Sequence, residues 1–335
     1  MTSISEIKND IKLKKLSPVY LLMGEEEFFI DKITNLFIQN ILSDDEKEFN
    51  LNILYGKDTS VDQIISICKK YPLMSPFQIV LIKEAQDLSR SIDSLIPYIK
   101  NPLDSTILIL NYKHKTIDKR KALFKEISKI GKVFESKRLY DNQVQNWISE
   151  KLTSGGYNID RKSIILINEH LGNNLSKIDN EIEKLKTIKK DDKNIISDDI
   201  EMHIGISKEF NNFELRRAIG EKKYAKALQI SKYFSDNPNS NPLVVTISTI
   251  FNFFNNLLVY HSNPSVDQKR MASLLGVNPY FLNEYSIASK NYSLRGVVKV
   301  ISIIRDYDMY SKGVKIKKAT PDLLNELISK IVDVN

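Results

Sequence analysis

The sequence is poor in residues that form disulfides and metal sites. Cys68 is the only cysteine among 335 residues, so the chain can form neither an internal disulfide nor a thiolate metal site. The four histidines are scattered, and none has the spacing of a metal-ligand pair. We therefore expect no bound metal and no cofactor, and the scarcity of cysteine favours a reducing compartment.

The sequence also lacks the signals of export and membrane insertion. Its first residues, Met1 to Glu6, do not show the basic and then apolar pattern of a secretion signal. The longest apolar tract, Leu243 to Tyr260, contains six Ser, Thr or Asn side chains, which are too many for a bilayer span. We expect a cytoplasmic protein with no membrane partner, in which this tract forms a buried or interface helix.

Recognisable catalytic patterns are missing as well. The chain has no GxSxG motif, no Cys–His pairing and no metal-ligand cluster. Its composition, 42% hydrophobic and 27% charged, is that of an ordinary folded protein long enough for two or three domains. The net charge of +7 favours acidic partners, although charge alone does not establish DNA binding.

The first part of the chain alternates strand and helix patterns. Short apolar runs predict strands at 19–23, 50–54, 78–83, 106–110 and 132–134. Helical patterns lie between them, at 28–42, 61–70, 92–98 and 119–130. This rhythm predicts an α/β domain with a parallel sheet and helices on both faces.

After Tyr140 we expect no further strand, and the pattern is helical to the end of the chain. Glycine and asparagine breaks at 155–156 and 172–174, followed by a lysine-rich stretch at 186–193, separate short helices from longer ones. The sequence therefore predicts three domains: an α/β domain at 1–140, a small helical domain at 141–208 and an all-α domain at 209–335.

The junction after the first strand has the frame of a phosphate site but the wrong side chains. A strand, Gly24 and a helix are present, but Glu25, Glu26 and Glu27 take the first turn, where carboxylates favour the helix dipole and repel a triphosphate. The further glycines, the Lys and the Ser or Thr of a P-loop are absent. Taken alone, these residues favour an ordinary strand-to-helix junction of an α/β protein over a degenerate nucleotide site.

Four segments, in their order and spacing, resemble the delta-subunit family of the bacterial DNA polymerase III clamp loader, a branch of the AAA+ clamp loaders. They span nearly the whole chain and lie at Gly24–Phe29, Tyr71–Ile82, Leu171–Leu185 and Phe213–Leu228. The resemblance implies an AAA+-like α/β domain with no functional P-loop, a helical lid and a C-terminal collar that joins other subunits.

The resemblance also implies a site for the ring-shaped sliding clamp. The family's apolar clamp-binding pair matches Leu73 and Met74, and the nearby Phe77 belongs to the same candidate site. Pro72 and Pro76 bracket the pair and keep it out of regular helix and strand geometry. The alternative is that these side chains only cap the core where a helix meets a strand.

Where an ATPase carries an Asp–Glu pair after its third strand, this chain has Lys83 and Glu84. We therefore expect no ATP hydrolysis by this polypeptide, with turnover supplied by neighbouring ATPase subunits. A basic stretch follows, and its first part is the candidate DNA-binding segment: Lys113, Lys115, Lys119, Arg120 and Lys121. A solvated helix face explains the same charges equally well.

Taken with the resemblance, the sequence predicts a non-catalytic clamp-loader subunit of the DNA polymerase III holoenzyme. Its expected partners are the sliding clamp, the ATPase and delta-prime-type loader subunits, and primer-template DNA within the complex. Two alternatives stay open, an atypical ATPase and an AAA+-like nucleic-acid-binding regulator. Nucleotide-dependent stabilisation would indicate the first, and tight DNA binding without clamp affinity would indicate the second.

Overall fold

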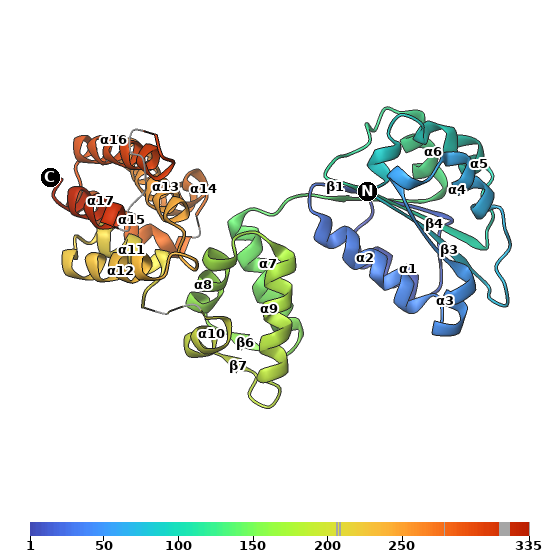
Figure 1. The fold of residues 1–335 in the computed structure, drawn as a ribbon, viewed down its shortest axis with the longest axis horizontal. Helices are drawn as coiled ribbons and strands as arrows, with labels where there is room; N and C mark the ends of the chain where they lie inside the picture. Colours follow the sequence, from blue (N-terminus) through green and yellow to red (C-terminus); the bar gives the residue numbers. More distant parts are fainter. Residues whose placement is uncertain (206, 208, 278, 315–321, 335) are drawn as a thin grey trace. The chain divides into compact units, whose positions relative to one another are not determined.

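The computed structural model describes residues 1–205, 207, 209–277, 279–314 and 322–334 (Figure 1). The chain divides into two compact units, Met1–Leu139 and Tyr140–Asn335. The boundary predicted between residues 208 and 209 involves residue 208, which lies outside the described residues. The division of the second unit into two domains stays a prediction.

The first unit is built on a parallel sheet, as predicted. Its strands follow the order β2-β3-β4-β1-β5, and every neighbouring pair is parallel. They are β1 (Val19–Gly24), β2 (Leu51–Tyr55), β3 (Gln78–Lys83), β4 (Thr106–Lys113) and β5 (Lys132–Ser136). β4 runs past the predicted end at Leu110 because the next residue, Asn111, is buried and hydrogen-bonded to Thr34 rather than placed in a loop.

Helices cover both faces of this sheet, which confirms the predicted layering (Figure 1). Tyr20 and Leu22 pack against one set of helices, while Leu21 and Met23 pack against the other, because successive strand residues point to opposite faces. The first face carries α1 (Ile4–Lys12) and α2 (Glu27–Asn40), and the second carries α4 (Val61–Cys68), α5 (Ile96–Lys100) and α6 (Ala122–Ile130).

Two short helices of this unit were not predicted, α1 and α3 (Asp44–Asn50). Each begins with a capping box, in which Ser3 pairs with Glu6 and Ser43 with Glu46. The helix predicted at 92–98 is divided into a 3-10 turn and α5, with Pro97 in the first turn of α5, where its missing N–H costs nothing. The other 3-10 turns of this unit are Gly56–Asp58 and Ala85–Leu88.

The second unit starts with a small group of helices: α7 (Asp141–Ser154), α8 (Arg161–Leu171), α9 (Leu175–Ile188) and α10 (Ser197–Ile204). The expectation that strands end at Tyr140 was wrong, because β6 (Asn158–Ile159) and β7 (Asn194–Ile195) form a small parallel pair. Two residues per strand are too few to produce a recognisable alternation in the sequence. α9 buries Leu175, Ile178, Ile182 and Leu185, the predicted apolar spacing.

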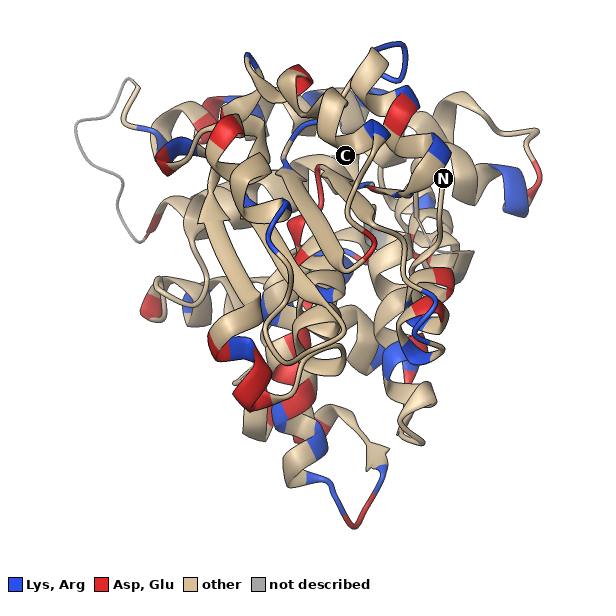
Figure 2. Cartoon of the chain, turned by 90° about the vertical axis from the view of Figure 1, so that its right-hand side faces the viewer, with Lys and Arg blue, Asp and Glu red and all other residues tan. Residues whose placement is uncertain are grey.

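The rest of the second unit is helical, as predicted. It contains α11 (Asn212–Gly220), α12 (Tyr224–Asp236), α13 (Leu243–Ser262), α14 (Gln268–Leu275), a 3-10 turn (Pro279–Phe281), α15 (Leu282–Asn291), α16 (Leu294–Ser311) and α17 (Asp322–Val332). Within the described residues, α13 is the one helix whose length and composition would allow it to cross a membrane. It packs against α16, α15 and α11 and buries Ile250, Phe254 and Leu257, as predicted for the apolar tract. Over both units, Lys and Arg are interspersed with Asp and Glu (Figure 2).

Candidate functional site

The candidate residues of the first unit lie at opposite edges of one sheet. Because all five strands run in parallel, their amino ends share one edge and their carboxyl ends share the other. The loop of residues 69–77, here called the tip loop, joins α4 to β3 at the amino edge. The segments that follow β1, β3 and β4 lie at the carboxyl edge.

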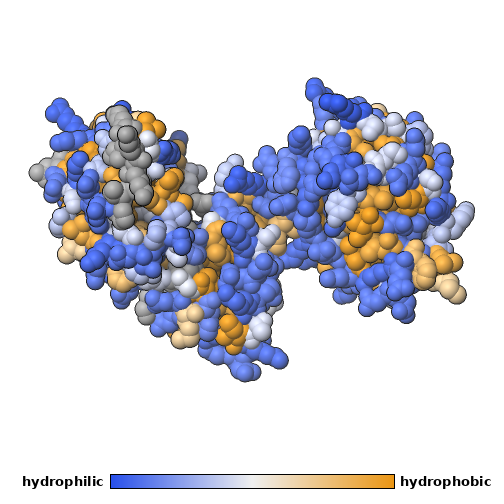
Figure 3. Space-filling view, in the orientation of Figure 1, coloured by the Kyte–Doolittle hydropathy of each residue, from blue (hydrophilic) through white to orange (hydrophobic). Residues whose placement is uncertain are grey.

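The tip loop exposes the predicted apolar pair. Leu73 is 56% exposed and Met74 is 95% exposed, whereas most residues of these types are buried. Figure 3 shows apolar surface on the unit at the end where Figure 1 labels α3. Met74 has φ of 52°, in the left-handed region, which costs a non-glycine residue about 1 kcal/mol or more. The surrounding contacts must therefore hold this conformation.

Buried polar side chains fix the base of the tip loop. Gln78, 3% exposed, donates its amide to the carbonyl of Lys70 and, at 2.7 Å, to the hydroxyl of Thr106. Thr106 in turn donates to the carbonyl of Cys68 at 3.0 Å. These bonds satisfy carbonyls at the end of α4 that have no partner within the helix. The loop thus leaves the sheet from a defined position.

A second anchor holds the loop at Leu73 itself. Asn50, the last residue of α3, is 1% exposed. Its side chain accepts the Leu73 N–H at 2.7 Å and donates to the Leu73 carbonyl at 2.9 Å. Hydrogen bonds from the backbone and hydroxyl of Ser43 and from the hydroxyl of Ser75 lower the pKa of Glu46, which also connects the loop to α3. The tip loop and α3 therefore form one preorganised piece.

Phe77 is placed differently from the apolar pair. It lies partly buried against the core on the α1 and α2 face of the sheet. Its N–H and carbonyl both bond to the hydroxyl of Ser75, at 3.4 and 3.0 Å. Phe77 therefore packs the loop against the core, and Leu73 and Met74 are the apolar side chains of the pair that solvent can reach.

The start of the loop after β1 hydrogen-bonds to the backbone of the same unit. The N–H of Gly24 donates to the carbonyl of Lys115 at 3.1 Å, and the N–H groups of Glu25 and Glu26 point to the carbonyl of Ser136, at 2.9 and 3.5 Å. The Ser136 hydroxyl donates to the Glu26 carbonyl at 2.6 Å. Gly24 has φ of 134°, and a Cβ there would lie 1.9 Å from the Ser136 carbonyl oxygen. Ser136 therefore occupies the space above this glycine.

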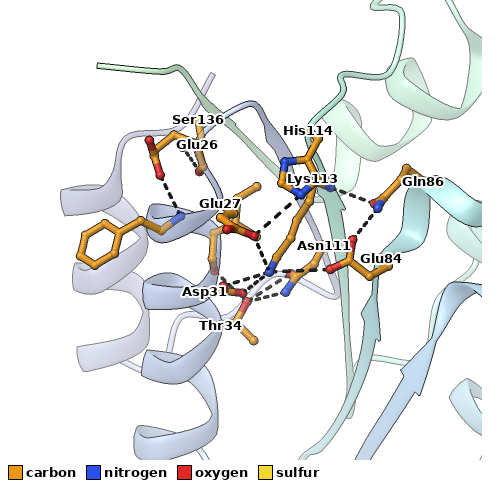
Figure 4. Close-up of polar contacts among 12 residues, drawn as sticks. Glu26, Glu27, Asp31, Thr34, Glu84, Gln86, Asn111, Lys113, His114 and Ser136 are labelled. Atoms are coloured by element: carbon orange, nitrogen blue, oxygen red, sulfur yellow. Dashed lines mark hydrogen bonds and ion pairs between the residues drawn. The ribbon is translucent and has the colours of Figure 1, made fainter. Parts of the chain in front are cut away.

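The carboxylates of this edge surround one lysine (Figure 4). The Nζ of Lys113, at the end of β4, lies 2.9 Å from Asp31, 3.5 Å from Glu27 and 3.8 Å from Glu84. The side chain of Lys113 is only 11% exposed, and its burial opposes the charge, but the three carboxylates outweigh burial and raise the pKa of Lys113. Lys113 is thus an internal counterion and is not accessible as part of a DNA-binding surface.

Glu26 caps α2 instead of facing a ligand. Its carboxylate accepts the N–H of Phe28 at 3.2 Å. Burial raises the pKa of Glu26 despite this hydrogen bond, and the neighbouring Glu27 raises it further. Glu25, Glu26 and Glu27 therefore make the edge acidic, and nothing in their arrangement supplies the cations that a triphosphate needs.

The remaining basic candidates lie on the surface after β4 and are partly paired. Lys119 pairs with Glu135 at 3.0 Å, and Arg120 pairs with Asp118 at 2.7 Å. Lys121 lies 3.9 Å from Asp93, and Lys115 has no ion pair among the described residues. Exposed pairs of this kind are weak, so these four side chains still present positive charge to solvent.

The described residues contain no group of three or more His, Cys, Asp or Glu side chains arranged to hold a metal ion. Cys68 is buried, and desolvation raises the pKa of its thiol to about 12. At neutral pH the thiol stays protonated and is a poor nucleophile. None of these groups offers an alternative catalytic centre.

Comparison with known proteins relates the first unit, which carries the tip loop and the loop after β1, to a protein family. Residues 20–137 match the family model described as DNA polymerase III, delta subunit. These residues are similar to the DNA polymerase III delta-subunit family. The matched range contains both the tip loop and the loop after β1, and it confirms the resemblance found in the sequence.

The delta-subunit relationship extends beyond the matched range. The chain is 26% identical to DNA polymerase III subunit delta of Bacillus subtilis (strain 168) over 97% of its own length and 95% of that protein. Its fold is similar to that of the Bacillus subtilis DNA clamp loader delta protein, with a TM-score of 0.60 at 24% identity, covering 98% of this chain and 99% of that one. The predicted order of an α/β part followed by helical parts is therefore a delta-subunit fold.

Proposed function

We propose that this chain binds the sliding clamp through Leu73 and Met74 and holds one interface of the ring open while the ring is loaded on primed DNA. The observation that carries this proposal is the tip loop, which exposes two large apolar side chains and is anchored by buried polar groups. An exposed apolar group on a rigid support is typical of an interface hot spot. Similarity to the delta-subunit family supplies the partner.

The energy of such a contact is sufficient for function. Burying each of the two side chains in a pocket of the partner contributes about 1.5–3 kcal/mol. The anchors at Asn50 and Gln78 reduce the entropy lost on binding, because the loop is already ordered. Together these terms correspond to about 100-fold or more in affinity.

The free energy of binding also drives the opening of the ring. A subunit that binds the open interface more tightly than the closed one shifts the clamp toward the open form, by as much as the difference between the two affinities. No chemical step on this chain is needed. Its partners would be the clamp, the ATPase and delta-prime-type subunits, and DNA, in the bacterial cytoplasm at the replication fork.

We infer that the chain does not hydrolyse ATP. The N–H groups of Gly24 and Glu25 bond to the carbonyls of Lys115 and Ser136, the Lys and the Ser or Thr of a P-loop are absent, and Lys113 is held by three carboxylates. Mg²⁺-ATP should therefore leave the thermal unfolding temperature of the chain unchanged. A nucleotide-dependent rise in that temperature would favour the atypical ATPase instead.

The second unit supports assembly with other subunits. Its helices α13 and α16 pack side by side and still expose apolar side chains to solvent: Val244, Phe251, Leu294 and Val298. An apolar surface on a packed helical domain is typical of a subunit interface. We assign this surface to contact with the neighbouring loader subunits.

Calorimetry of clamp binding tests the proposal. The double variant Leu73→Ala/Met74→Ala should weaken the affinity for the clamp about 100-fold or more. A matched control is Leu13→Ala/Met202→Ala, because these two side chains are 54% and 78% exposed and lie outside the tip loop. If the tip variant binds the clamp as tightly as the control does, the site assignment is wrong.

A further inference from the structure

α3, which packs beside the tip loop, has an inverted burial pattern. Its only apolar residue, Phe49, is 65% exposed, whereas the neighbouring amide Asn50 is 1% exposed. A helix that served only the core would bury the phenyl ring and expose the amide, since burial of a phenylalanine is favourable. The inversion indicates that Phe49 is placed for contact with another molecule.

Phe49 and the apolar pair are held on one support. Asn50 bonds to both backbone groups of Leu73, so the residue next to Phe49 in the chain is tied directly to the tip. Asn50 also donates to the carbonyl of Glu46 within α3, at 3.2 Å. Phe49 and Leu73 are both exposed, and the buried amide that holds Leu73 is the residue next to Phe49 in the chain.

Charge distinguishes the border of this surface from its centre. α3 carries Asp44, Asp45, Glu46 and Glu48 against a single Lys47, which pairs with Asp44 at 2.7 Å. α3 itself thus carries a net negative charge beside the apolar residues, with Lys14 close enough to act on Glu46. A complementary partner has an apolar pocket with basic residues at its rim.

We propose that the clamp-docking surface extends from the tip loop onto α3, with Phe49 as a third anchor and the acidic residues of α3 as its rim. This inference rests on the proposed function, and it names the sliding clamp as the partner and a basic rim as the feature that α3 meets. The phenyl ring adds apolar contact, and Asp45 and Glu48 increase the rate of association through charge.

The first test is the affinity of full-length Phe49→Ala for the clamp. We expect a loss of about tenfold in affinity with an unchanged circular dichroism spectrum, because the ring is exposed. Leu274→Ala, in α14, removes another exposed apolar side chain, which lies outside both proposed contact surfaces, and should leave clamp affinity unchanged. Unchanged affinity for Phe49→Ala, with binding lost in Leu73→Ala/Met74→Ala, would overturn this inference and leave the proposed function standing. Unchanged affinity in the tip variant would overturn the proposed function itself.

The second test is the rate of association measured at several salt concentrations. The double variant Asp45→Lys/Glu48→Lys should associate with the clamp at least about fivefold more slowly at low salt, and the difference should shrink as salt rises. Asp58→Lys is the control, because this exposed carboxylate lies after β2, at the opposite edge of the sheet. An equal association rate for the α3 variant and the control would rule out the acidic rim.

Discussion

One side chain, that of Asn50, makes a hydrogen bond with both the N–H and the carbonyl of a single distant residue, Leu73. The two residues are 23 positions apart in the sequence. The two bonds satisfy both backbone groups of Leu73, as a neighbouring strand would, and hold the loop that exposes Leu73 and Met74. The tip loop therefore depends on a polar side chain that is itself buried.

Replacement of Asn50 should lower both stability and clamp affinity without changing any exposed side chain of the tip loop. Asn50→Ala leaves the apolar tip intact but removes both bonds, so we expect a loss of about 1–3 kcal/mol in the free energy of unfolding. We also expect about tenfold weaker clamp binding, because the loop must be ordered on binding. Urea unfolding and calorimetry measure the two effects. Asn40→Ala, which removes an exposed amide on α2, should change neither, and equal behaviour of the two variants would contradict the anchor role.

Gly24→Ala should be strongly destabilising. The added Cβ would lie 1.9 Å from the Ser136 carbonyl oxygen, and φ at this position is 134°. Backbone strain and displacement of β5 together should cost about 3 kcal/mol or more in stability. Gly172→Ala is the control, since φ there is also positive but no atom lies within 4 Å of the added Cβ. Thermal unfolding that shows equal losses in both variants would mean that Ser136 does not close this site.

Lys113→Met should lower the stability of the first unit, because it removes the positive charge among the carboxylates at the carboxyl edge of the sheet. Without the ammonium group, Glu27, Asp31 and Glu84 repel one another, and we expect a loss of about 1–3 kcal/mol at neutral pH. Because the pKa of Lys113 is raised in the folded state, its stabilising effect is complete below its ordinary value of 10.5 and is lost as pH rises through the folded value. The difference between wild type and variant should therefore disappear at strongly alkaline pH.

Urea unfolding at several pH values measures this effect. The control is Lys119→Met, which breaks one exposed ion pair with Glu135 and should cost less than about 1 kcal/mol. A loss for Lys113→Met that equals the loss for Lys119→Met at every pH would show that the three carboxylates do not depend on Lys113.

The surface after β4 should contribute to DNA binding within the loader. Lys115→Glu/Lys121→Glu in the assembled complex should weaken binding to primer-template DNA. The slope of log affinity against log salt should fall by about one for each phosphate that the variant no longer neutralises. Lys8→Glu, on the other face of the sheet, is the control. Unchanged affinity and slope in the double variant would assign these lysines to a solvated face.

The positions of β1, β3 and β4 were predictable because each is a compact apolar run buried on both faces, as in Val19–Met23. The helices α1 and α3 were missed although Ser3 and Ser43 mark their starts, because neither has the long apolar stripe that identifies longer helices. Polar residues also misled the prediction within β4, where Asn111 is buried against Thr34. The pattern of apolar residues thus located the buried strands. It missed the short helices that begin with a capping box and the end of β4, which contains a buried polar pair.

The candidate site also has a part that the sequence indicated and a part that it did not. The sequence indicated Leu73 and Met74 through their proline brackets and the family resemblance, and these residues are exposed. It gave no indication of the support, because Asn50 bonds to Leu73 across 23 residues and Lys113 bonds to Asp31 across 82. For the same reason Lys113 was counted with the DNA-binding candidates. Phe49 could have been suspected only from its position as the lone apolar residue in an acidic helix.

The carbonyl of Ser136 has a consequence for how this unit is maintained in the cell. Nucleotide-binding domains of this shape complete their first loop with a diffusible phosphate, so their local order varies with the supply of that molecule. Here the acceptor is part of the same chain and is always present beside Gly24. The order of the unit that carries the tip loop therefore does not depend on the supply of nucleotide, and the proposed clamp contact should not depend on it either.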